Sequence, residues 1–295
     1  MKNSLRVLVL GASGLIGHKL LQELSSNCEV FGTLRNSKKD YGNLPLFAGI
    51  NIIENIDVLT SKKIERVLLA VNPDIILNCI GITKRKIDYC SPIEVITVNS
   101  IFPHKLADWA KIKNKKVIHF STDCVFDGRV GNYSESSTTT ASDVYGKTKA
   151  LGEINYNHTL TIRSSFVGQE LFGKTELLEW FLAQDNKNIS GYRKTLYSGV
   201  STIFMAHVIK KIILEYPELT GLYNLALDQP ISKYELLCIA KEAFHKNITI
   251  TPDDINIHVP TLDATKLKKE INLKVPTWDV MMKELAQSNN LYRNY

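Results

Sequence analysis

The feature that most constrains the fold is a glycine pattern near the start of the sequence. Gly11, Gly14 and Gly17 stand three residues apart and directly follow the apolar run Leu5–Leu10. Glycine allows a tight turn and a close approach of the backbone to a pyrophosphate, and a helix that starts there offers N–H groups and a positive dipole end. The pattern therefore predicts a strand, a phosphate-binding turn and a helix, as at the first βα junction of a dinucleotide-binding fold. We expect the other residues of the turn to contact the cofactor as well: Ser13, Leu15 and Ile16.

Apolar runs and helical patterns alternate through the first half of the chain. Runs typical of buried parallel strands occupy Leu5–Leu10, Val30–Leu34, Ile75–Ile80 and Val117–Phe120. Helical patterns lie between them at Leu15–Ser25, Ser61–Val71 and Ile93–Lys111. The succession predicts an α/β fold with a Rossmann-like, doubly wound parallel sheet. We expect residues 1–165 to form mainly the cofactor-binding Rossmann domain, with some later segments returning to it, and residues 166–295 to form mainly a smaller substrate-binding α/β part.

Charge and composition exclude several classes of protein. The chain has 36 Lys and Arg against 30 Asp and Glu, and this mild excess is scattered along the sequence. Scattered charge argues against a nucleic-acid-binding protein and suits a small anionic substrate. No apolar run is long enough for a transmembrane helix, so we expect no membrane partner. The five cysteines form no CxxC pair, which argues against a metal site and a disulfide framework and favours a cytoplasmic protein with reduced thiols.

The end of the second apolar run indicates which dinucleotide is bound. The segment Val30–Asn36 contains no Asp or Glu, whereas Arg35 stands where a Rossmann fold meets the adenosine ribose. A guanidinium there would pair with a 2′-phosphate, so we predict NADP (NADPH), with NAD as the alternative cofactor and a surface arginine as the alternative interpretation. Asp57 would reach the adenine or begin a helix. Asn78 and Gly81, around the end of the third apolar run, are expected to line the same cofactor site.

Two short segments carry groups suited to acid–base chemistry. Tyr145 and Lys149 are four residues apart, so on a helix they share one face. A neighbouring ammonium favours the tyrosinate, which would make the phenol usable as a proton donor or acceptor near neutral pH. Ser121, Thr122 and Asp123 come just past the fourth apolar run, at the carboxyl end of a parallel strand, where ligands bind in such sheets.

Together these motifs make the chain similar to an extended short-chain dehydrogenase/reductase. Ser121–Gly128 resembles the STDYVFDG segment of the dTDP-4-dehydrorhamnose reductase family, and Val144–Lys149 resembles that family's VYGKTK. The likeness continues through Arg163–Val167 and Gly199–Thr202 to Pro276–Trp278. It therefore covers nearly the whole chain.

The resemblance implies an activity and roles for individual residues. It implies reduction of the 4-keto group of a nucleotide-linked 6-deoxy sugar, as in dTDP-rhamnose and polysaccharide precursor biosynthesis. Thr122 and Tyr145 would bind the keto oxygen, Tyr145 would give the proton, and Lys149 would hold the nicotinamide ribose. The substrate would lie against residues from both halves of the chain: Ser121, Thr122, Asp123, Ser165, Phe166 and Thr202.

Departures from the family pattern leave alternatives open. Cys124 replaces a tyrosine, and His258–Leu262 lacks the arginine and serine of the family's RPxxSxL stretch. Lys84–Lys86 would meet a diphosphate or form a solvated loop. A nucleotide-sugar epimerase of the same fold and a non-catalytic NADP-binding regulatory subunit are therefore the alternative functions. The exact sugar, the nucleotide base and the formation of a homodimer stay open.

Overall fold

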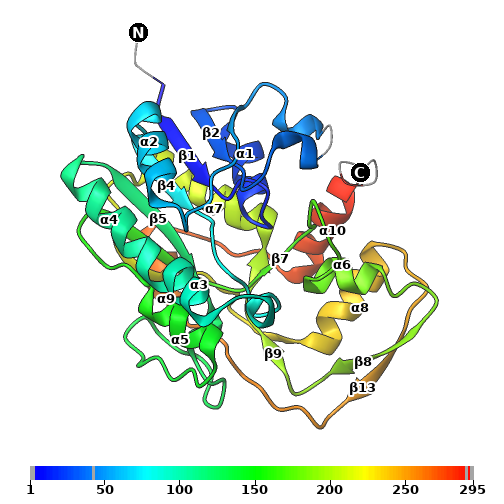
Figure 1. Cartoon of the computed structure of the whole chain (residues 1–295). Coiled ribbons are helices and arrows are strands. Elements are labelled where there is room, and N and C mark those ends of the chain that lie inside the picture. Colours follow the sequence, from blue (N-terminus) through cyan, green and yellow to red (C-terminus); the bar gives the residue numbers. More distant parts are fainter. Residues whose placement is uncertain (1–3, 42–43, 290–291, 293–295) are drawn as a thin grey trace.

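The computed structural model describes residues 4–41, 44–289 and 292. These residues form a central sheet of seven parallel strands in the order β11-β6-β5-β4-β1-β2-β3 (Figure 1). The strands are β1 (Arg6–Leu10), β2 (Glu29–Thr33), β3 (Asn51–Ile53), β4 (Ile75–Asn78), β5 (Lys116–Ser121), β6 (Thr159–Arg163) and β11 (Gly221–Asn224). The predicted doubly wound parallel sheet is confirmed. The strand order reverses between β1 and β4, and ligands bind at such a switch point.

The side chains of β1 show how the sheet separates two hydrophobic cores. Val7 and Val9 point to one face, and Leu8 and Leu10 point to the other, because successive side chains of a strand alternate. All four are fully buried, which explains why the run has no polar position. The first core is covered by α1 (Gly17–Leu24) and α7 (Thr202–Glu215), and the second by α2 (Ser61–Val71) and α4 (Phe102–Ile112).

The helix predicted over Ile93–Lys111 is interrupted. The structure has α3 (Pro92–Ile96), a π-helical turn η4 (Thr97–Ile101) and then α4. Pro103 has no N–H to donate to the carbonyl of Asn99, four residues earlier, so the regular helical pattern cannot continue there. The buried Asn99 side chain instead accepts from the backbone N–H of Ile82 at 2.8 Å and donates to the Ile82 carbonyl at 3.0 Å.

The C-terminal segments add three two-stranded sheets within the described residues. These pair β7 (Phe166–Val167) with β10 (Val200–Ser201), β9 (Leu196–Tyr197) with β12 (Ile231–Ser232), and β8 (Asn188–Tyr192) with β13 (Thr249–Asp253). The remaining helices are α5 (Val144–Leu151), α6 (Leu177–Leu182), α8 (Lys233–Ala243), α9 (Thr265–Glu270) and α10 (Trp278–Ser288), with 3₁₀ turns η1 (Lys38–Tyr41), η2 (Pro45–Phe47), η3 (Ile87–Tyr89) and η5 (Asp123–Val125).

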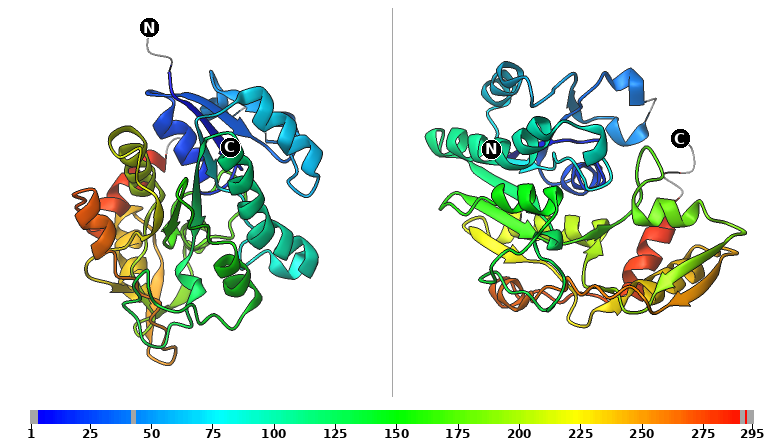
Figure 2. Two further views of the ribbon diagram at one scale, coloured as in Figure 1. Left: turned by 90° about the vertical axis from the view of Figure 1, so that its left-hand side faces the viewer. Right: turned by 60° about the horizontal axis from the view of Figure 1, so that its bottom comes forward.

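The later segments are not a separate appendage. Figure 2 shows the yellow-to-red helices on one side of the central sheet and the cyan helices on the other. β11 completes the sheet beside β6, and α7 packs against α1. The division near residue 165 stays a prediction.

A buried ion pair fixes the carboxyl ends of β5 and β6. Arg163 donates from Nε and Nη2 to the two carboxylate oxygens of Glu153, each at 2.6 Å, and the Ser121 hydroxyl donates to the same carboxylate at 2.7 Å. The Arg163 guanidinium also lies 5.2 Å from the centre of the Phe126 ring. The side chains of the pair are 4% and 10% exposed, so removing one charge leaves the other buried without compensation.

Glu153→Gln should therefore lower the free energy of unfolding by about 3–5 kcal/mol. Glu29→Gln is the matched control, because Glu29 pairs with Arg6 at 2.9 Å on the surface, where such a pair contributes about 0–1 kcal/mol. Urea unfolding of both variants tests this. Equal losses of unfolding free energy in the two variants would show that burial of the Glu153–Arg163 pair does not increase the cost of removing one of its charges.

Candidate active site

The glycine turn has the shape that its spacing predicts. Gly11 has a φ of +78°, and a Cβ placed on Gly17 would lie 2.2 Å from the Gly11 carbonyl oxygen, so the turn closes only with glycine at these two positions. Thr33, at the end of β2, holds the turn: its hydroxyl accepts from the Gly11 N–H at 3.1 Å and its carbonyl from the Ala12 N–H at 2.9 Å. The turn therefore leaves a backbone cradle in which a phosphate fits at the start of α1.

A buried histidine supports this turn, and the sequence analysis did not single it out. His18 Nδ1 lies 2.8 Å from the Gly14 carbonyl oxygen, and Nε2 lies 2.8 Å from the Tyr292 hydroxyl. Burial lowers the pKa of His18 to about 3, so the ring is neutral at physiological pH. A neutral ring that donates from Nδ1 to the carbonyl accepts at Nε2 from the tyrosine.

Arg35 and Asp57, both predicted to contact the cofactor, contact each other. The distance from Arg35 Nη2 to Asp57 Oδ2 is 3.2 Å, at the carboxyl ends of β2 and β3. The Arg35 side chain is 68% exposed, so its guanidinium has donors left for a further anion. Asp57 also accepts from the Leu59 N–H at 3.0 Å, which ties this carboxylate to the turn before α2.

Asn78 and Gly81 have different surroundings. Asn78 is fully buried, and its amide donates to His119 Nδ1 at 3.1 Å and accepts from the Ile80 N–H at 3.3 Å. Its side chain therefore holds the chain after β4 from the buried side and does not reach the surface. Gly81 is exposed, and a Cβ placed there would lie 4.0 Å from Lys149 Nζ. The structure thus brings Gly81, but not the Asn78 side chain, to an open face beside Lys149.

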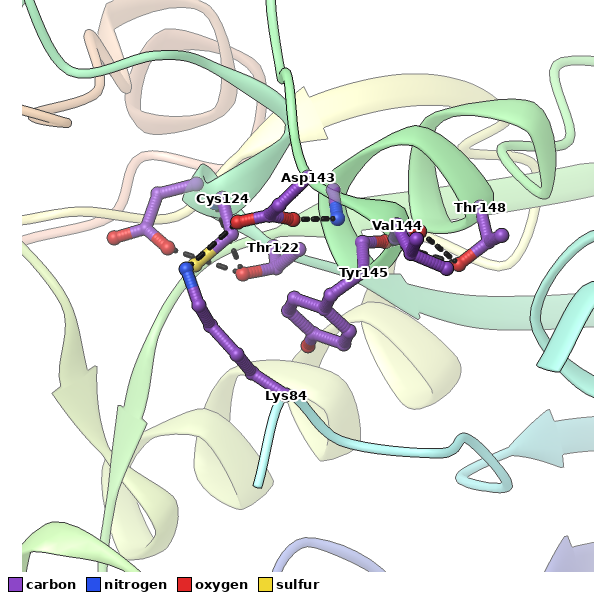
Figure 3. A network of polar contacts seen from close by, with 9 residues as sticks. Lys84, Thr122, Cys124, Asp143, Val144, Tyr145 and Thr148 are labelled. Carbon is purple, nitrogen blue, oxygen red and sulfur yellow. Dashed lines mark hydrogen bonds and ion pairs between the residues drawn. The ribbon is translucent and has the colours of Figure 1, made fainter. Parts of the chain in front are cut away.

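Thr122 and Tyr145 are brought together by close packing of α5 against the loop after β5 (Figure 3). Asp143 caps α5 by accepting from the Gly146 N–H at 2.8 Å, and the helix then places Tyr145 and Lys149 one turn apart. The Thr122 hydroxyl donates to Asp123 at 3.0 Å and accepts from the Cys124 N–H at 3.1 Å, which fixes its position.

The Tyr145 phenol is held in its protonated form. Burial raises its pKa above the usual value, the nearby Cys124 thiol adds to the rise, and contact with the Thr122 hydroxyl opposes it less strongly. The sequence alone suggested the opposite direction, from the charge of Lys149. That ammonium donates instead to the Phe120 carbonyl at 2.7 Å, and burial lowers its own pKa to about 8. Tyr145 therefore keeps its proton at neutral pH.

The other predicted substrate residues lie at different depths. The Ser121 hydroxyl is used by Glu153, and Thr202 is fully buried at the start of α7. Phe166 on β7 is partly buried and meets the Phe120 ring edge-on at 6.2 Å between centroids. Ser165 is partly exposed between β6 and β7. Their contacts with a substrate stay predictions.

Lys84 has a local partner. Its ammonium donates to Asp143 at 2.7 Å, which raises the pKa of Lys84 and ties the chain after β4 to the start of α5 (Figure 3). Arg85 and Lys86 beside it are exposed.

The described residues contain no group of three or more His, Cys, Asp or Glu side chains placed to hold a metal ion. Over the same residues, no helix is long and apolar enough to cross a membrane.

Comparison with known proteins places the chain in a family. Residues 5–290 match the family described as the RmlD substrate binding domain. The chain belongs to this family. It is 25% identical to a dTDP-4-dehydrorhamnose reductase from Salmonella typhimurium, over 95% of this chain and 97% of the relative. It is 23% identical to the methionine adenosyltransferase 2 subunit beta of Xenopus tropicalis, over 90% and 82% of the two chains.

Family membership agrees with the resemblance drawn from the motifs, and the fold is shared as well. The solved structure of a dTDP-4-dehydrorhamnose reductase from Bacillus anthracis, in complex with NADP, superposes with a TM-score of 0.79 at 18% identity. The superposition covers 96% of this chain and 98% of the other. This member of the RmlD family therefore has the fold of its relatives along almost its entire length.

The lowered pKa of Lys149 gives a pH-dependent stability. Because the folded pKa is about 8 and the usual value is 10.5, the buried ammonium destabilises the folded state below pH 8, and this cost fades as the pH rises from 8 to 10.5. The free energy of unfolding of Lys149→Met minus that of wild type should accordingly decrease as the pH rises from 8 to 10.5, by on the order of 1–3 kcal/mol.

Urea unfolding at pH 7 to 10.5 measures this trend. Lys147→Met is the control, since Lys147 is exposed on the same helix. If the difference in unfolding free energy between Lys149→Met and wild type changes with pH no more than that of Lys147→Met does, the lowered pKa is contradicted.

Proposed function

We propose that this protein is an NADPH-dependent reductase of the 4-keto group of a nucleotide-linked 6-deoxy sugar. The observation that carries the proposal is the placement of Thr122, protonated Tyr145 and Lys149 beside the open face at Gly81. Membership of the RmlD family and the likeness to dTDP-4-dehydrorhamnose reductases support it. The glycine turn and Arg35 would hold the cofactor, at the same edge of the sheet.

The mechanism follows from the protonation states of the site. Bound NADPH would supply a hydride to the carbonyl carbon. Tyr145 would donate a hydrogen bond to the keto oxygen, where negative charge develops as the carbonyl is reduced. Thr122 would join it by turning its one hydroxyl proton from Asp123 to that oxygen. Tyr145 then transfers its proton to that oxygen, and its raised pKa ensures that the proton is present when the reaction starts. The Lys149 ammonium, which lies close to Gly81, would hold the cofactor's ribose.

Two other functions remain alternatives. The likeness to methionine adenosyltransferase 2 subunit beta favours a non-catalytic regulatory subunit. An epimerase of the same fold would use the same groups and recycle its cofactor. A 4-keto sugar nucleotide incubated with the protein and NADPH distinguishes the three, because the reductase consumes NADPH, the epimerase changes the sugar without net consumption, and the regulatory subunit does neither.

Tyr145→Phe should reduce turnover by about 10²–10⁴-fold, because it removes the proton donor and leaves the ring in place. NADPH oxidation in the presence of a dTDP-linked 4-keto-6-deoxy sugar measures this, and NADPH binding should stay within a few-fold of wild type. Tyr89→Phe is the control, since Tyr89 is 88% exposed outside the site. Near-normal turnover of Tyr145→Phe would remove this residue from the reaction.

Arg35→Asp should remove the preference for NADPH over NADH. In the wild type we expect a preference of about tenfold or more, because a charge-assisted hydrogen bond to the 2′-phosphate contributes roughly 1.5–3 kcal/mol. The variant places a carboxylate beside that phosphate, so kcat/KM for NADPH should fall while that for NADH stays similar. Arg66→Asp, exposed on α2, is the control for the charge change. An unchanged cofactor ratio in Arg35→Asp would show that Arg35 lies outside the site.

A homodimer is also part of the proposal. Ile93, Val144 and Leu151 are 76%, 51% and 67% exposed on the neighbouring helices α3 and α5, and a second copy of the chain would cover them. The cytoplasmic location and the absence of nucleic-acid binding stay predictions.

A further inference from the structure

The C-terminal part of the chain returns to the glycine turn through Tyr292. A turn after α10, in which the Tyr292 N–H donates to the Asn289 carbonyl at 3.0 Å, brings this residue against the first hydrophobic core. Its hydroxyl lies 2.8 Å from His18 Nε2, and the two rings meet edge-on with their centroids 5.7 Å apart. The Lys19 ammonium lies 4.8 Å from the centre of the same tyrosine ring. Two consecutive residues of α1 therefore hold Tyr292 in place.

His18 transmits this contact to the backbone of the turn. Its Nδ1 lies 2.8 Å from the Gly14 carbonyl oxygen, which also accepts from the His18 N–H at 3.3 Å. A carbonyl can only accept, so Nδ1 carries the ring proton, and Nε2 accepts from the Tyr292 hydroxyl. The ring is fully buried, so water does not compete for either nitrogen. Tyr292 thereby fixes both the tautomer and the rotation of the ring that holds Gly14.

The Gly14 carbonyl belongs to the peptide unit that offers a donor to the phosphate cradle. A trans peptide unit is planar, so the Leu15 N–H points in the direction opposite to the Gly14 carbonyl. Because that carbonyl is turned toward His18, the Leu15 N–H is turned out of the start of α1. Among residues 4–41, 44–289 and 292, this N–H has no hydrogen-bond partner. An N–H left unpaired before a helix is a donor for an anion such as a pyrophosphate.

We propose that His18 and Tyr292 are positioning residues for the cofactor, because they fix the Gly14–Leu15 peptide with its N–H toward the pyrophosphate. The C-terminal segment thus contributes to dinucleotide affinity without touching the dinucleotide. Loss of either side chain leaves the three glycines of the turn in place but frees this one peptide to rotate. The inference rests on the proposed function only for the identity of the dinucleotide.

NADPH titration followed by fluorescence tests this with two variants of His18, each of which keeps one of its two contacts. An asparagine amide takes the place of Nδ1 and keeps the bond to Gly14, whereas a glutamine amide takes the place of Nε2 and keeps the bond to Tyr292. His18→Asn should therefore bind NADPH within about twofold of wild type, and His18→Gln roughly three- to tenfold more weakly, the scale of one neutral hydrogen bond.

Substitution of the tyrosine tests the second contact. Tyr292→Phe should weaken NADPH binding about two- to threefold, the lower end of the same scale, because the histidine ring loses the hydroxyl that orients it. The same substitution in His18→Asn should have no further effect, since that variant has already lost the contact with Tyr292. Tyr156→Phe is the matched control and should bind like wild type, because the Tyr156 hydroxyl lies 2.8 Å from His104 Nδ1 in a tyrosine–histidine pair on the surface.

Turnover separates positioning of the cofactor from a general loss of folded protein. KM for NADPH should rise in His18→Gln while kcat at saturating NADPH stays within about twofold of wild type. Equal NADPH affinity of His18→Asn and His18→Gln would overturn the inference, and so would a wild-type protein that binds neither NADPH nor NADH. If NADPH affinity follows the expected order but no 4-keto sugar nucleotide is reduced, the proposed reductase activity fails and the positioning role of His18 and Tyr292 stands.

Discussion

The candidate site depends on how closely α5 packs against its neighbours. A Cβ on Gly146 would lie 2.2 Å from the Cys124 carbonyl oxygen, and one on Gly152 would lie 1.9 Å from the Asn99 carbonyl oxygen. The two glycines, six residues apart, therefore press the helix against the loop after β5 at one end and against the π-helical turn at the other. Tyr145 directly precedes Gly146 and Lys149 lies between the two glycines, so these backbone contacts set the distance of both side chains from Thr122.

This packing also explains the chemistry of the site. A helix held this close to the sheet removes water from the phenol and from the ammonium, which raises the pKa of Tyr145 and lowers that of Lys149. The two shifts move the pKa values of the two groups apart, so that the phenol holds its proton more tightly than the ammonium does. The ion pair of Glu153 with Arg163, together with Ser121, joins the carboxyl ends of β5 and β6. These ends are therefore held in place where the substrate would bind.

The sequence predicted four of the seven strands of the central sheet (β1, β2, β4 and β5), the glycine turn and the tyrosine–lysine pair, because these are local signals. Apolar runs, glycine spacing and a separation of four residues each depend on a single segment. The π-helical turn could have been anticipated from Pro103, but the partner of Asn99 is 17 residues away, at Ile82. The direction of the Tyr145 pKa was predicted wrongly because burial, which outweighs the lysine charge, is a tertiary property.

The place of β11 in the central sheet has a consequence for how the chain folds during synthesis. β6 ends at Arg163, but its outer edge is paired by β11, which ends at Asn224. Until the ribosome has released that segment, β6 is an open sheet edge with unpaired N–H and carbonyl groups, the kind of edge that recruits other chains. The part of the chain already synthesised must therefore stay free of association with other chains while about sixty more residues emerge. At typical synthesis rates this delay is roughly 3–12 s.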